Sequence, residues 1–127
     1  MLEKLSFIFA ISFLLNLVWE NLHARLYVHY KGRKITEWVL LHATLADAIF
    51  ITVGGFLCMT IPYLQNHLWI SIIMGVILAV GIEKWALATG RWSYNDRMPI
   101  LPLIKTGLTP TIQLGILGYA TLLIVGM

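Results

Sequence analysis

Three carboxylates lie within stretches of this chain that are otherwise apolar: Glu20, Asp47 and Glu83. An ionisable side chain at the centre of a bilayer costs roughly 2.5–3.5 kcal/mol, so each needs a partner or a function. A carboxyl group in a secluded pocket can hold and deliver a proton near neutral pH. The pattern therefore predicts acid–base chemistry, with Glu83 or Asp47 donating a proton and Glu20 accepting one or orienting the substrate.

Polar and aromatic residues that can bind a substrate or hydrogen-bond the carboxylates occur near them. The candidates are Asn21, His23, Arg91, Trp92, Tyr94 and Gln113. The segment 90–99 combines donors, aromatic rings and a proline, as a loop covering a ligand would. A structural alternative is that Arg91 pairs with Glu83, or that a buried network with Arg25 or Lys84 fixes the helix register.

A metal site or a nucleophilic site has weaker support. Glu20 and His23 have the Glu-x-x-His spacing of di-iron helix bundles, but those sites need two such motifs and the chain has one. Cys58, the single cysteine, lies in an apolar run without a neighbouring histidine and is expected to be a buried apolar side chain. We predict no metal and no cofactor.

The elements that must position these residues are membrane spans. The chain has 127 residues, 59% of them hydrophobic and 12% charged, with a mean hydropathy of +0.82. A soluble domain is about a quarter charged, so we predict an all-α, multi-pass membrane protein with one domain, residues 1–127. A span needs about 20 apolar residues, and four stretches qualify or nearly do: about 5–22, 38–61, 68–88 and 103–125.

These four stretches predict a four-transmembrane-helix bundle. The start of the last helix is the least defined boundary and falls between Leu101 and Pro110. No small-x-small cleavage site follows the first stretch, so we expect an uncleaved span rather than a signal peptide.

Basic residues set the predicted orientation. Between the first and second stretches lie Arg25, Lys31, Arg33 and Lys34. Between or at the ends of the third and fourth lie Lys84, Arg91, Arg97 and Lys105. Short loops rich in Lys and Arg stay in the cytoplasm, so both termini are expected on the non-cytoplasmic side of a cell (inner) membrane. With no basic stripe outside these loops, the net charge of +3 indicates no nucleic-acid partner.

The helical period predicts where the polar faces meet. One arc of the first helix carries Ser12, Asn16, Glu20, His23 and Tyr27. Asp47 lies about nine residues into the second helix, while Glu83 and Gln113 lie a few residues from the cytoplasmic ends of the third and fourth. We therefore expect the polar faces to converge in a pocket in the inner half of the membrane. His42 lies five residues before Asp47, nearly on the opposite side of its helix, and is not expected to pair with it.

Several motifs together carry a resemblance: Trp19-Glu20-Asn21 with His23 and Leu26-Tyr27, then His42…Asp47, then Glu83 with Gly90-Arg91-Trp92-Ser93-Tyr94…Met98-Pro99, then Gly107-Leu108-Thr109-Pro110…Gln113. Over nearly its whole length the chain resembles a family of small four-span bacterial membrane proteins, which implies a bacterial membrane location and no particular reaction. More distantly, the intramembrane glutamate and Trp-x-Tyr are similar to those of membrane-embedded carotenoid cyclases and hydratases. The Pro-x-Glu-Glu cluster of the cyclases has no counterpart here.

We therefore expect a membrane protein that binds or transforms an apolar, isoprenoid-like lipid entering from the inner leaflet. Cofactor-free isomerisation, cyclisation or hydration would fit the carboxylates. Two alternatives stay open: a small proton-coupled exporter working as a dimer, and an accessory subunit of a membrane complex whose polar stripe is an interface. The sequence does not decide whether the chain forms a homo-oligomer.

Overall fold

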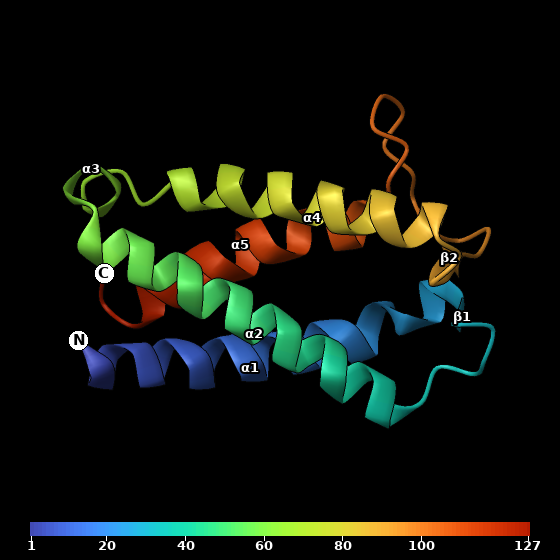
Figure 1. Ribbon diagram of the computed structural model, residues 1–127, viewed down its shortest axis with the longest axis horizontal. Coiled ribbons are helices and arrows are strands. Elements are labelled where there is room, and N and C mark those ends of the chain that lie inside the picture. Colours follow the sequence, from blue (N-terminus) through green and yellow to red (C-terminus); the bar gives the residue numbers. More distant parts are fainter.

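The computed structural model describes all residues, 1–127, and is mostly helical (Figure 1). Its elements in chain order are α1 (Leu2–His23), the 3-10 turn η1 (Ala24–Leu26), β1 (Tyr27–Tyr30), α2 (Glu37–Thr60), α3 (Pro62–Gln65), α4 (Ile70–Ala88), β2 (Trp92–Tyr94) and α5 (Leu108–Ile124). Three of the helices, α1, α2 and α4, are long and apolar enough to cross a membrane. The fourth long helix, α5, is apolar but has only 17 residues.

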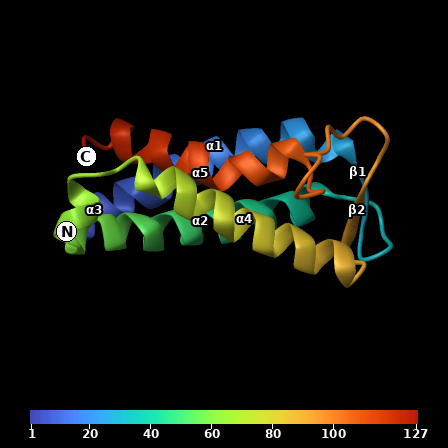
Figure 2. The same cartoon turned by 90° about the horizontal axis from the view of Figure 1, so that it is seen from above.

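The four long helices run along the long axis of the molecule, with both chain termini and α3 at one end and the strands at the other (Figure 1). α1 packs along α2, and α4 packs along α5. The two pairs meet mainly through α1 and α5, whereas α2 and α4 scarcely touch. Seen from above, α1 and α5 lie on one side over most of their length, and α2 and α4 on the other (Figure 2).

Local signals explain where the helices begin and end. Thr36 caps α2, because its side-chain oxygen accepts a hydrogen bond from the backbone N–H of Val39 at 3.3 Å. Pro62 cannot continue the hydrogen bonding of α2 and instead occupies the first position of α3. Gly90 has φ +70°, a conformation that favours glycine, and reverses the chain after α4.

Three of the predicted spans agree with the structure, and the fourth needs correction. The observed α1, α2 and α4 begin and end within three residues of the predicted bounds. The last helix begins at Leu108, later than the 103 of the predicted span but within the predicted interval from Leu101 to Pro110, and Pro110 lies in its first turn. The preceding residues form a narrow loop in which Ile100 pairs with Gly107. Pro102 lies in this loop and has no N–H to continue a helix.

A two-stranded antiparallel ribbon, β1 with β2, was not predicted. Tyr27 lies opposite Tyr94 in its register. After Tyr30 the chain makes a two-residue turn in which Lys31 and Gly32 both have positive φ, 51° and 74°, as a type I′ turn requires. The ribbon ties the end of α1 to the end of α4.

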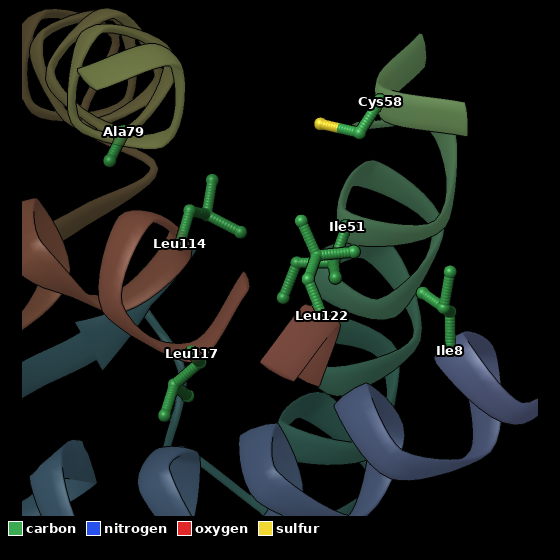
Figure 3. Close-up of a cluster of buried hydrophobic side chains, with 7 residues drawn as sticks. All are labelled: Ile8, Ile51, Cys58, Ala79, Leu114, Leu117 and Leu122. Atoms are coloured by element: carbon green, nitrogen blue, oxygen red, sulfur yellow. The ribbon is translucent and has the colours of Figure 1, made fainter. Parts of the chain in front are cut away.

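The apolar core lies away from the ribbon. All four long helices contribute to one cluster of buried side chains: Ile8, Ile51, Cys58, Ala79, Leu114, Leu117 and Leu122 (Figure 3). Many large apolar side chains point outward instead; Leu14 is 62% exposed and Ile77 is 68% exposed. Exposed apolar surface on this scale suits a protein whose surrounding solvent is lipid.

The backbones of α4 and α5 touch at Gly75 and Gly115. A Cβ on Gly75 would lie 2.4 Å from the backbone N of Gly115, and a Cβ on Gly115 would lie 2.6 Å from the carbonyl oxygen of Ile72. Small residues permit such close helix packing in membranes. The same face of α4 buries Ala79, Glu83 and Ala86.

Replacing Gly75 with leucine should therefore destabilise the protein, because the new side chain has backbone rather than movable atoms in its way. We expect a loss of about 1–3 kcal/mol or more, as for other overpacked cores. The measurement is thermal unfolding in detergent. Gly81→Leu on the same helix is the matched control, since a Cβ there meets nothing within 4 Å. Equal melting temperatures for the two variants would contradict the close contact.

Candidate functional site

The side-chain amide of Gln113 joins three helices at the centre of the site. Its Nε2 lies 2.9 Å from each of three oxygen atoms, Asn16 Oδ1, Glu20 Oε1 and Asp47 Oδ2. An amide nitrogen carries only two hydrogens, so three acceptors compete for it. Gln113 and Asn16 are buried, at 4% and 0% exposure. The predicted convergence of polar faces from α1, α2 and α5 is confirmed at this point.

His23 extends this centre toward the ribbon. Its Nε2 lies 3.0 Å from Glu20 Oε2, and its Nδ1 lies 3.0 Å from Thr109 Oγ1 at the start of α5. The spacing of three residues places Glu20 and His23 on one face of α1. No three His, Cys, Asp or Glu side chains converge on a point that suits a metal ion. The Glu-x-x-His motif thus forms a hydrogen-bonded pair in this structure.

Glu83 has a separate set of partners, all of them neutral donors. The hydroxyl of Tyr27 donates to Oε1 at 3.3 Å, while Trp92 Nε1 and the hydroxyl of Tyr94 donate to Oε2 at 3.0 and 2.6 Å. The chain reversal at Gly90 brings β2 back along the end of α4. Trp92 and Tyr94 were among the predicted site residues, and the structure places both on this carboxylate.

The two tyrosines remain hydrogen-bond donors at ordinary pH. Burial, and next the hydrogen bond to Glu83, raises the pKa of the Tyr94 hydroxyl above its usual value. Burial, and next the negative charge of Glu83, likewise raises the pKa of Tyr27. Both hydroxyls therefore keep the protons with which they hold the carboxylate.

The structural alternative in which Arg91 pairs with Glu83 is not found. The Arg91 guanidinium donates from Nη2 to the hydroxyl of Tyr30 at 3.0 Å and stacks over the ring of Trp85, 5.2 Å from its centre. The ribbon directs the Arg91 side chain away from Glu83. The Glu83 oxygens accept hydrogen bonds from Tyr27, Trp92 and Tyr94 instead. The alternative network with Arg25 or Lys84 is also absent, because the one ion pair in the structure is Glu20 with His23.

Two other polar residues, Asn21 and His42, make hydrogen bonds within their own helices. Asn21 is exposed and donates to the carbonyl of Leu17, so the prediction that it partners the carboxylates is wrong. It follows Glu20 directly, and one residue along a helix turns the side chain by about 100°. His42 makes no hydrogen bond with Asp47, as predicted, yet both line the same cavity.

That cavity is about 640 Å³ in volume, within the usual range for small-molecule sites. Fifteen of its 24 lining residues are hydrophobic, and its wall includes all three predicted carboxylates, Glu20, Asp47 and Glu83. It lies where α2 and α4 diverge. Trp38 of α2 and Trp85 of α4 line it while being 68% and 53% exposed, so the cavity reaches the outer surface between these helices.

Sequence reasoning missed several members of the site. Asn16 and Tyr27 were placed on the correct face of α1, but their bonds to Gln113 and Glu83 join distant helices and leave no local signal. Thr109, which bonds to His23, was not among the predicted site residues. The one local sequence signal for the ribbon was Gly32, since glycine favours the positive φ that a two-residue turn requires.

Comparison with models of protein families, with curated proteins and with solved structures found no match to this chain. A functional assignment therefore depends on the geometry of the site.

Gln113→Leu should destabilise the protein, because Asn16, Glu20 and Asp47 would lose their common donor inside the structure. A buried acceptor left without a partner costs about 1–3 kcal/mol. Unfolding in detergent measures the loss, and Gln65→Leu, which removes an exposed amide, is the matched control. In a double-mutant cycle with Asp47→Asn we expect a coupling of about 0.5–3 kcal/mol, whereas additive effects would argue against the shared amide.

Proposed function

We propose that this chain is a four-span protein of the bacterial inner membrane that binds an apolar, isoprenoid-like lipid and transforms it by cofactor-free acid–base chemistry. One observation carries the proposal: carboxyl oxygens of Glu20 and Asp47 both lie 2.9 Å from the same Gln113 nitrogen, on the wall of a mostly apolar cavity. The apolar wall selects a lipid-like substrate, and the carboxyl pair supplies the means to move a proton.

The four-span topology is supported by the distribution of charge. Eight of the nine basic residues belong to the ribbon end of the molecule, and Lys4 alone lies at the end that holds the termini. In the proposed orientation the ribbon end faces the cytoplasm and both termini face the opposite side. α5 spans with the other three helices, although it is the shortest.

The carboxyl pair suits proton exchange with a carbon–carbon double bond. Two carboxylates this close in a low-dielectric site cannot both ionise readily, so the pair retains one proton. We assign that proton to Asp47. Its O–H adds to one alkene carbon through the π electrons, and Glu20 removes a proton from the carbon next to the resulting cation. The product is an isomer, and transfer from Glu20 back to Asp47 restores the pair.

The other groups of the cavity stabilise the cationic intermediate. Trp92 and Tyr27 are on the wall, and aromatic faces attract cations by about 0.5–2 kcal/mol. Glu83 also lies on this wall, but its oxygens already accept hydrogen bonds from Tyr27, Trp92 and Tyr94. This arrangement favours Asp47 over Glu83 as the proton donor.

The topology is tested by fusing reporter enzymes to the protein. Alkaline phosphatase, which is active only outside the cytoplasm, should be active when attached after Met127 and inactive when inserted at Gly32. A fluorescent protein that folds in the cytoplasm should give the opposite pattern. The reverse result at both positions would overturn the orientation.

The reaction is tested with Glu20→Gln, Asp47→Asn and Glu83→Gln in the native host. We expect Asp47→Asn and Glu20→Gln to abolish conversion, because each removes one end of the proton exchange, and Glu83→Gln to slow it by about tenfold or more, a loss of ~1.4 kcal/mol in transition-state stabilisation. The measurement is the profile of host lipids and pigments.

Glu37→Gln is the control, since this carboxylate is exposed at the start of α2. It should leave the lipid profile as in the unaltered protein. Unchanged profiles in all three site variants, at normal expression, would refute the enzymatic reading.

A further inference from the structure

Two cations lie against one aromatic ring at the ribbon end of the cavity. The Arg91 guanidinium and the Lys31 ammonium are each 5.5 Å from the ring centre of Tyr30. The backbone fixes this arrangement, because the N–H of Lys31 donates to the carbonyl oxygen of Arg91 at 2.6 Å. An anion near this ring would be attracted by both positive charges.

No carboxylate of the protein supplies that anion. The one ion pair in the structure joins His23 and Glu20, and neither Arg91 nor Lys31 takes part. Arg91 makes a single side-chain hydrogen bond, to the hydroxyl of Tyr30, and its other N–H donors have no partner in the chain. A guanidinium with free donors is well suited to bind phosphate or carboxylate.

The position of Arg91 connects this charge to the proposed substrate site. Arg91, Tyr30 and His29 line the same cavity as Asp47. Arg91 is on the ribbon, which is the end assigned to the cytoplasmic interface, whereas Asp47 lies farther along the helices. Between them the wall is largely apolar and reaches the surface where α2 and α4 diverge.

We propose that the cavity takes an anionic amphiphile, whose phosphate or carboxylate head binds Arg91 beside Lys31 and whose chain extends between α2 and α4 to Asp47. This inference rests on the proposed function and narrows its substrate class from an apolar lipid to one with a charged head at the inner interface. Glu83 does not oppose such binding strongly, because its oxygens already accept from Tyr27, Trp92 and Tyr94.

The test compares two probes with the same chain, farnesyl phosphate and farnesol, with inorganic phosphate as the headgroup alone. Binding to the purified protein in nonionic detergent is followed by tryptophan fluorescence, since Trp38, Trp85 and Trp92 line the cavity. We expect farnesyl phosphate to bind about tenfold more tightly than farnesol, a difference of ~1.4 kcal/mol. Inorganic phosphate should bind far more weakly than either amphiphile.

Variants then locate the headgroup. Arg91→Gln should lose the preference for farnesyl phosphate and keep its affinity for farnesol, which also shows that the variant is folded. Lys31→Gln should reduce the preference severalfold and serves as the second variant if Arg91→Gln fails to fold. Arg33→Gln removes a nearby exposed cation that, unlike Lys31 and Arg91, does not lie over the Tyr30 ring, and should behave as the unaltered protein.

The remaining outcomes separate the two proposals. Equal affinity for both amphiphiles, or a preference that survives Arg91→Gln, would overturn the headgroup site and leave the apolar-lipid function standing. Inorganic phosphate binding as tightly as farnesyl phosphate would show an ion site without a chain. Binding of neither amphiphile would overturn this inference together with the proposed function.

Discussion

The site depends on one amide nitrogen that is the shared hydrogen-bond donor for oxygen atoms from two other helices. Gln113 of α5 lies within hydrogen-bonding distance of Asn16, Glu20 and Asp47, so it fixes the rotation of α1 and α2 relative to α5. In an apolar surrounding these oxygens have no solvent to replace a lost donor. The helices are therefore locked in the register that brings the two carboxyl groups together, and the position of the cavity follows from that register.

The two ends of the molecule are packed differently. At the end with the termini, apolar side chains from all four long helices fill the interior, and glycine permits α4 and α5 to touch. At the ribbon end α2 and α4 diverge, and hydrogen bonds rather than apolar packing connect the chain. A tightly packed half allows the other half to keep an open volume without loss of a defined structure.

Composition and helical periodicity were enough to predict the long helices and the polar face of α1, because both are local properties of the chain. They also indicated that Glu20, Asp47 and Gln113 would meet. The partners of Glu83 and Arg91 were harder to predict, since the ribbon decides them through pairing between residues more than sixty positions apart. The start of α5 could be predicted only to within an interval for a related reason. The apolar residues 100–104 lie in a loop in which Leu101 bonds to Thr106 and Ile100 pairs with Gly107, and hydropathy does not distinguish such a loop from a helix.

The shortness of α5 has a consequence for the proposed proton transfer. Seventeen residues span about 25 Å, less than the roughly 30 Å of hydrocarbon in an ordinary bilayer. In the proposed orientation the deficit falls on the inner leaflet, where thinning of the lipid accommodates a short helix. Water would then approach the first turn of α5, where Thr109 contacts His23. The imidazole, bonded in turn to Glu20, would give the secluded carboxyl pair a short route for proton exchange with the cytoplasm.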